Sequence, residues 1–227
     1  MKKSLEKKTP AFLQNEKMEM EENVRELKKD IEDWKNFTVN DITNDFDYSY
    51  SRVISNKLKG RIFSQNGTPI IAFQRIDRGI RTNSRILASS TEFKIYFEYT
   101  HNRNLVFYDD IYLGKIINDS VLFNSSDIKI GSYDRYASGD PYRYSIEFDS
   151  KKVAAVNKNT DRKNFVNNPF YKHNTRNRFR RQRKIFRETP PTYPLIDANG
   201  ELDGEELKWT IAIGIFEAVY HGFDFTT

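Results

Sequence analysis

The most apolar stretch of this chain is Leu207-Lys208-Trp209-Thr210-Ile211-Ala212-Ile213-Gly214-Ile215-Phe216-Glu217-Ala218-Val219-Tyr220, in a sequence of which 30% of the residues are charged. An acidic loop, residues 197–206, precedes this stretch, and His221-Gly222 follows it. Carboxylates at the start and a glycine just past the end suit the two poles of a helix. The pattern favours a helix that is apolar on nearly every face, and a pair of buried strands is the alternative.

This helix needs a protein interior around it. It is too short for a bilayer, which takes about 20 apolar residues, and Glu217 interrupts it. The chain has 227 residues, 37% of them hydrophobic and 14% aromatic, so its phenylalanines and tyrosines must supply much of the core.

The absence of cysteine excludes disulfides, thiolate zinc sites and a cysteine nucleophile. No apolar stretch follows Met1-Lys2-Lys3, so we expect neither a signal peptide nor a transmembrane segment, and we expect a cytoplasmic location.

The chain divides into three parts by pattern. Residues 1–35 predict an N-terminal amphipathic helix, residues 36–59 a polar linker, and residues 60–227 a β-rich domain with a basic insertion at 157–187. In the first part, apolar residues recur at helical spacing and form a stripe: Met20, Val24, Leu27, Ile31 and Trp34. The stripe fits a helix that docks on its own domain, a short coiled-coil homodimer, or an interface for another protein.

From Gly60 onward the sequence reads as short strands separated by tight turns. Asn66-Gly67 and Asp149-Ser150 predict hairpin turns, and Asp109-Asp110 separates two further strands. Expected strands are 61–63, 69–74, 93–99, 105–108, 111–117, 121–123, 128–130, 142–148, 153–156 and 193–196. We therefore predict a mainly β (α+β) fold, an antiparallel β-barrel or closed sandwich around the buried C-terminal helix.

A hairpin carrying Lys-Val-Ala, residues 146–154, and the acidic loop that runs into the apolar helix resemble the tubby C-terminal-like superfamily. That superfamily includes the LURP-one-related proteins and the phospholipid scramblases. The stretch Tyr112-Leu113-Gly114-Lys115-Ile116-Ile117 is similar in style to the inner strands of the family. The resemblance, over about residues 60–222, implies a closed antiparallel barrel threaded by its last helix, and a non-enzymatic binding protein.

The net charge of +5 is a local property of the basic insertion. Without its eight clustered cations the rest of the chain carries 5 − 8 = −3. Arginine forks bind phosphates, so the segment predicts an anionic partner, either an anionic lipid surface or nucleic acid. Alternatively, it pairs with the acidic N-terminal helix or with a protein. The eight cations are Lys172, Arg176, Arg178, Arg180, Arg181, Arg183, Lys184 and Arg187.

Catalysis has one weak candidate. Glu92-Phe93-Lys94 has the Glu-x-Lys spacing that some metal-dependent nucleases combine with an upstream acid, here Asp77. The loop 197–205 has oxygen ligands at alternate positions, as in a calcium loop, but its glycines are out of register, so a turn and helix start is the better interpretation. The histidines, His101, His173 and His221, form no ligand pair, and we expect no metal and no cofactor.

Overall fold

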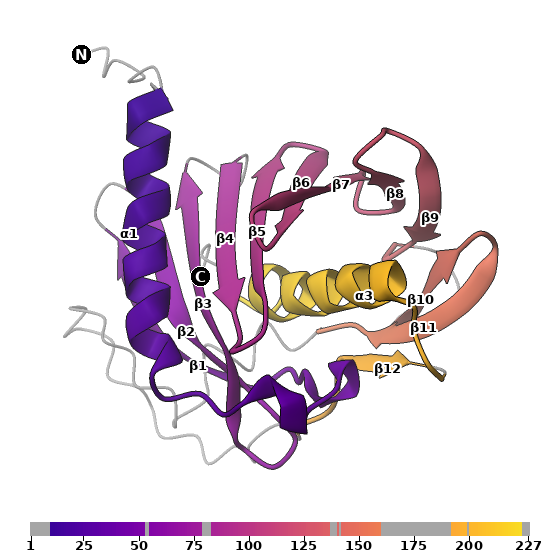
Figure 1. Ribbon diagram of the computed structural model, residues 1–227, viewed down its shortest axis with the longest axis horizontal. Helices are drawn as coiled ribbons and strands as arrows, with labels where there is room; N and C mark the ends of the chain where they lie inside the picture. Colours follow the sequence, from indigo (N-terminus) through magenta and orange to yellow (C-terminus); the bar gives the residue numbers. More distant parts are fainter. Residues whose placement is uncertain are drawn as a thin grey trace.

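The apolar C-terminal helix and the sheet around it are described by a computed structural model. The structure describes residues 10–52, 55–78, 83–136, 140, 142–159, 192–198 and 200–223. In Figure 1 the helix α3 (Gly204–Phe216) lies inside a strongly curled sheet, while the helix α1 (Pro10–Lys28) stands on the outside of it. The fold class predicted from the sequence, mainly β with an N-terminal and a buried C-terminal helix, is confirmed.

The sheet is a single antiparallel meander in which each strand pairs with the next along the chain. Its strands are β1 Phe46–Arg52, β2 Asn56–Phe63, β3 Pro69–Arg78, β4 Asn83–Ser89, β5 Lys94–Thr100, β6 Arg103–Tyr108, β7 Ile111–Ile117, β8 Val121–Asn124, β9 Lys129–Tyr133, β10 Arg143–Phe148, β11 Lys151–Asn157 and β12 Ile196–Ala198.

The sheet does not close, in contrast to the closed barrel or sandwich expected from the sequence. β1 and β12 are its two edges in the described residues. Just before these two strands, Thr43 and Pro194 form an isolated antiparallel bridge, and the Leu195 N–H donates to the Ile42 carbonyl at 2.7 Å. A few backbone contacts therefore bring the edges together where a continuous ladder is missing.

Turns of two or three residues make several of the hairpins tight. Asp109-Asp110, Asn118-Asp119 and Asp149-Ser150 all have positive φ, between 46° and 66°, which Asp and Asn tolerate better than most residues. The turn predicted at Asn66-Gly67 differs, because only Gly67 has a positive φ (77°) and the loop spans residues 64–68.

The helix α3 begins as the acidic loop predicts. The Asp203 carboxylate accepts hydrogen bonds from the backbone N–H groups of Glu205 and Glu206, and the Glu206 side chain accepts from the Asp203 N–H. This capping box satisfies N–H groups that the first turn leaves free. From Trp209 to Phe216 every residue is buried, so the helix interpretation is confirmed over the strand pair. The chain continues as a π-helical segment, η3 (Glu217–His221).

Gly214 lets α3 approach the open edge of the sheet closely. A Cβ at this position would lie 3.0 Å from the Ile196 side chain and 3.4 Å from that of Ile42. A larger residue would separate α3 from β12 and from the segment before β1, so the glycine serves the packing here.

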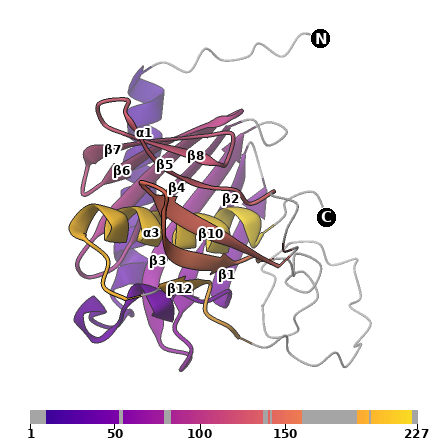
Figure 2. The same cartoon turned by 90° about the vertical axis from the view of Figure 1, so that its right-hand side faces the viewer.

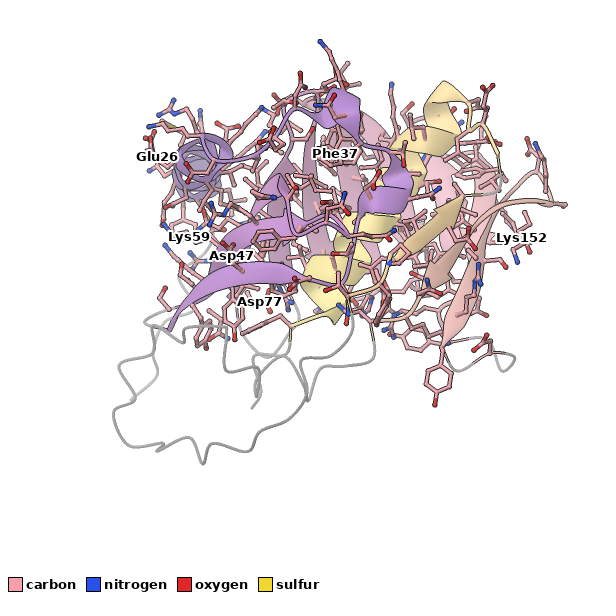
Figure 3. All side chains as sticks on the ribbon, turned by 90° about the horizontal axis from the view of Figure 1, so that it is seen from below. Glu26, Phe37, Asp47, Lys59, Asp77 and Lys152 are labelled. Atoms are coloured by element: carbon pink, nitrogen blue, oxygen red, sulfur yellow. The ribbon has the colours of Figure 1, made fainter. Side chains whose placement is uncertain are left out.

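The helix α1 packs on the outer face of β3 and β4, on the opposite side of the sheet from α3 (Figures 1 and 3). Met20 and Val24 are buried there, and Leu27 and Ile31 are partly buried beside them. The contacts on the sheet come from Ala72, Ile76, Leu87 and Tyr96.

Ile31 and Trp34 lie beyond the end of this helix, contrary to the predicted stripe, although Ile31 still packs beside it. α1 ends at Lys28, and Trp34 begins a short 3-10 segment, η1 (Trp34–Asn36), that turns into the main core. Its ring meets that of Phe93 edge-on, with centroids 4.9 Å apart. The helical spacing of Trp34 from Ile31 is accidental, because the non-helical residues 29–33 separate Trp34 from α1.

The expected linker, residues 36–59, holds a second 3-10 segment, η2 (Val39–Asp41), then β1 and half of β2. In β1, Phe46 and Tyr48 are buried and Tyr50 packs against the same core, while Asp47, Ser49 and Ser51 lie between them. This period of two is that of a strand with one covered face, and the interleaved polar residues hid it.

Candidate functional site

A polar network lies at the C-terminal end of α3, where the otherwise apolar interior of the sheet ends (Figure 2 shows this interior from the side of β10). Its centre is Glu217, which is 1% exposed. The Arg135 guanidinium donates from Nε to Oε2 at 2.9 Å and from Nη2 to Oε1 at 3.0 Å. The Tyr144 hydroxyl donates to Oε2 at 3.1 Å, and the Asn159 backbone N–H donates to Oε1 at 2.7 Å.

These four donors saturate the carboxylate. A buried charge is tolerated only when it is paired and fully hydrogen-bonded, and Glu217 meets both conditions. The network also ties three distant parts of the chain together: the segment after β9, strand β10, and the residues that follow β11. Glu217 therefore fastens the end of α3 to the last strands of the sheet.

A second carboxylate lies in the same region and is not saturated. Asp119, in the turn between β7 and β8, is 8% exposed. Burial and the Glu217 charge raise the pKa of Asp119, while Arg135 lowers it. No hydrogen bond or ion pair from the described residues reaches its carboxylate.

Several buried polar groups on this side of the sheet interior or on β6 have no hydrogen-bond partner among the described residues. They are the Tyr133 hydroxyl and both amide atoms of Asn104 and of Asn159. The Tyr133 ring lies 5.5 Å from that of Tyr144, and burial raises the pKa of both tyrosines well above the ordinary value. Unfilled hydrogen-bonding capacity of this kind marks places where water or a ligand binds.

A buried ion pair lies at the same end of the helix. Arg75 and Asp77, on β3, are each 2% exposed and form two hydrogen bonds, at 2.9 and 2.5 Å. Arg75 also donates to the carbonyls of Val219, Tyr220 and Phe223 at 2.9 to 3.0 Å. It therefore occupies carbonyls that the end of the helix leaves free, and Asp77 neutralises it.

The proposed nuclease residues are not brought together. Asp77 pairs in register with Ser84 and thus with Tyr99, at the opposite end of β5 from Lys94, a separation of roughly 17 Å at about 3.4 Å per residue. Asp77 also faces the interior (Figure 3), whereas Lys94 shares the outer face with Tyr96. Lys94 forms ion pairs with Glu21 and Asp110, and Glu92 lies 3.8 Å from Lys35.

Other predicted sites have the following positions. The eight cations, Lys172, Arg176, Arg178, Arg180, Arg181, Arg183, Lys184 and Arg187, lie outside the described residues. Within the described part of the chain, no cluster of three or more histidine, cysteine or acidic side chains is placed to hold a metal ion. None of the described helices has both the length and the apolar character that a membrane crossing requires.

The glutamates of α1 all have cationic partners in this chain. Glu16 pairs with Arg78 and Arg85 of the sheet, Glu19 with Lys57, and Glu21 with Lys94. The remaining two form pairs along the helix itself, Glu22 with Arg25 and Glu26 with Lys29. The acidic face of α1 is therefore already neutralised by nearby cations.

Comparisons of this chain with protein-family models, with curated proteins and with solved structures found no match.

Proposed function

We propose that the protein is a cytoplasmic, tubby-like, non-enzymatic binding protein that engages an anionic partner, phospholipid head groups foremost, through the basic segment Lys172 to Arg187. The helix-in-sheet arrangement of the described residues supports the family resemblance. The eight cations of the segment supply the charge that attracts the partner.

One observation carries this proposal. The alternative for the basic segment was internal pairing with the acidic N-terminal helix, yet the glutamates of α1 are occupied by cations of the sheet and of α1 itself. If these glutamates paired with the basic segment instead, existing ion pairs would be lost, so the net gain in free energy would be small. The cations of the segment are better neutralised by an external anion.

The nearest described residues before and after the basic segment, around Asn159 and Tyr193, are held by hydrogen bonds to the fold. The Asn159 N–H donates to Glu217, and the Tyr193 N–H donates to the Asn44 side chain at 3.0 Å. The Tyr193 hydroxyl donates to the Lys158 carbonyl at 3.3 Å. The chain thus leaves and re-enters the described fold at neighbouring points, and changes in the segment need not disturb the sheet.

The test is sedimentation with vesicles. Changing Arg178, Arg180, Arg181 and Arg183 to Gln should strongly reduce binding to vesicles with an anionic lipid fraction, because each basic residue near such a surface contributes about 1 kcal/mol to binding. The thermal stability of the protein should not change. The matched control removes the same charge from exposed positions on the strands, with Gln at Arg103, Lys129, Lys151 and Lys152. Equal binding by the two variants would overturn the proposal.

Oligonucleotides form the second arm of the experiment. If single-stranded nucleic acid is the partner, the same arginine variant should lower the slope of log K against log salt by about 2.8, since each lost phosphate contact contributes about 0.7. Binding that follows the anionic lipid fraction and ignores oligonucleotides would support the lipid partner.

A further inference from the structure

Among the described residues, the region around Asp119 holds more negative than positive charge. Asp119 and Glu217 are two carboxylates, and the one nearby guanidinium that bears on the pKa of Asp119 is that of Arg135. The Nε and Nη2 groups of Arg135 both donate hydrogen bonds to Glu217. Asp119 is left with solvent contact through an 8% exposed side chain, and with no counter-ion within bonding distance among the described residues.

Aromatic rings gather beside this carboxylate. The pKa of Tyr99 is raised by burial first and then by Asp119, Tyr220 and Tyr136, which places these groups within electrostatic reach of one another. The rings of Tyr99 and Tyr220 are 4.9 Å apart. Tyr133, whose N–H donates to the Ser120 carbonyl next to Asp119, adds a further ring. The negative faces of such rings attract cations, and the Tyr220 ring already holds the Arg75 guanidinium 4.6 Å from its centroid.

Two buried side chains with unfilled hydrogen bonds belong to residues that neighbour Ser120 or Tyr99. The Tyr133 hydroxyl is one of them, and Tyr133 is 2% exposed. Asn104 is fully buried, lies opposite Tyr99 in the β5–β6 register, and leaves both amide atoms without a partner in the described structure. These groups offer a donor and acceptors to a molecule that enters beside Asp119.

The end of the helix adds to the negative field. α3 and η3 end in this region, and the C-terminal end of a helix carries partial negative charge. Arg75 already makes use of it, by donating to three carbonyls at this end. These carbonyls are thus already matched by Arg75, and the unpaired Asp119 carboxylate and the tyrosine rings are the groups that favour a further positive charge.

We infer that the region bounded by Asp119, Tyr133, Tyr99 and Asn104 is a binding site for a small organic ammonium ion. Asp119 supplies the counter-charge, the tyrosines supply cation–π contacts, and the unpartnered polar groups accept or donate hydrogen bonds. A divalent metal fits less well, because calcium takes six to eight oxygen ligands and Glu217, the other carboxylate, is saturated. This site is separate from the anionic partner proposed above and does not rest on it.

The experiment is a titration of the full chain with tetramethylammonium and with ethylammonium, followed by amide chemical shifts. Saturable shifts of the amides of β6, β7 and β9 are expected, with a dissociation constant of about 1 mM, as a few cation–π contacts and one charge would give. tert-Butanol, a neutral molecule of similar shape, should cause no saturable shift. No saturable response to either ammonium, or an equal response to tert-butanol, would refute the site.

Two variants assign the site to these residues. Asp119→Asn should weaken ammonium binding at least tenfold, whereas Asp149→Asn should not change it. Asp149 is the matched control, since it is also a turn aspartate with positive φ (46° against 49°) but is exposed. Unchanged affinity in Asp119→Asn would place the ammonium elsewhere.

Tyr133→Phe provides an independent reading. It removes a hydroxyl that has no partner among the described residues, so the melting temperature should stay the same or rise. Ammonium binding should weaken severalfold if the hydroxyl faces the ligand. A loss of stability with unchanged binding would show that the hydroxyl serves the fold, and would remove it from the site.

Discussion

Glu217 concentrates four hydrogen bonds on one buried carboxylate, at the point where a helix passes from apolar to polar surroundings. Such a buried ion pair adds little net stability, because the cost of removing its charges from water offsets much of the pairing energy. Removal of one partner, in contrast, leaves the other charge buried and alone.

The first prediction follows from this asymmetry. Glu217→Gln keeps the size of the side chain but leaves Arg135 without its counter-charge and places an amide N–H against donors. Urea unfolding should show a loss of about 3 kcal/mol. Glu147→Gln, at an exposed position of β10, is the control and should change stability by less than about 0.5 kcal/mol. Equal effects of the two changes would contradict the role given to the network.

The second prediction concerns Asp119 and pH. Its pKa is raised in the folded protein, so the folded state holds this proton more tightly than the unfolded state does. Stability from this group is therefore present at low pH and is lost as pH rises from the ordinary aspartate pKa, about 3.9, through the raised value. Arg135 and Glu217 are the charged groups that also act on it.

The measurement is thermal unfolding of the wild type and of Asp119→Asn across this range. The stability difference should move in favour of the variant as pH rises above about 4 and then level off. A difference that is constant with pH would mean that Asp119 titrates alike in both states.

At the level of residues, the sequence analysis identified Glu217 only as an interruption of an apolar run and predicted none of its partners. Its partners come from 58 to 82 residues away, from loops and strand ends without any shared pattern. Asp119 sits in a turn, where an aspartate is expected for backbone reasons alone. A single sequence gives no sign of which turn aspartate faces the interior, so this site was missed.

Among the elements, α3 supports the third prediction. Ile213→Asp puts a charge at a position that is 1% exposed and should cost more than about 4 kcal/mol, enough to prevent stable folding. Leu207→Asp makes the same type of change at a 38% exposed position of the same helix, where the N-terminal turn favours a carboxylate. Near-ultraviolet circular dichroism and urea unfolding should separate the two variants, and an Ile213→Asp protein that unfolds cooperatively at the wild-type midpoint would disprove the central place of the helix.

The helix α1 offers a similar pair for the fourth prediction. Met20 is fully buried against the sheet, whereas Met18 is 58% exposed. Met20→Ala should lower stability by about 2–4 kcal/mol, and Met18→Ala by less than about 0.5 kcal/mol. If α1 instead forms an intermolecular coiled coil, the loss for Met20→Ala should depend on protein concentration, which sedimentation equilibrium would reveal.

Elements with a strong local signal were predicted well from the sequence. The apolar run gave α3, and the turn pairs at Asp109-Asp110 and Asp149-Ser150 marked real hairpins. β1 was missed because its buried Phe46 and Tyr48 alternate with Asp47 and Ser49, so its average polarity resembles that of a linker. Trp34 was assigned to the wrong element, since helical spacing continued by chance past the end of α1.

For the whole molecule, the sheet has two unequal halves. β3 and neighbouring strands lie between α1 outside and α3 inside, and β3 is buried along nearly its whole length. β7 and β10 show the alternating burial of strands with one covered face. The closed barrel or sandwich predicted from the sequence was wrong in this respect, because only a few contacts such as Thr43 with Pro194 join the two edges, and no local pattern reveals whether a full ladder forms between them.

The fifth prediction follows from the unequal cover. Amide hydrogens of β3 and β4 should exchange more slowly than those of β7 to β10, because the two-sided strands open only when the whole fold opens. Hydrogen exchange followed by mass spectrometry on peptides from the two regions measures this directly. Equal protection of β3 and β4 and of β7 to β10 would contradict this prediction, because it would show that the two parts of the sheet unfold together although only one is packed on both faces.

The position of α3 in the chain also has a consequence for synthesis. The inner face of the sheet is built from β1 onward, but the helix that covers it follows the twelfth strand and is therefore synthesised after the whole sheet. At roughly 5–20 residues per second, roughly 9 to 35 seconds separate the emergence of β1 from that of η3. During this interval the apolar faces of nearly all the strands lack their partner, so the nascent chain is exposed to aggregation and should depend on chaperones until α3 has emerged.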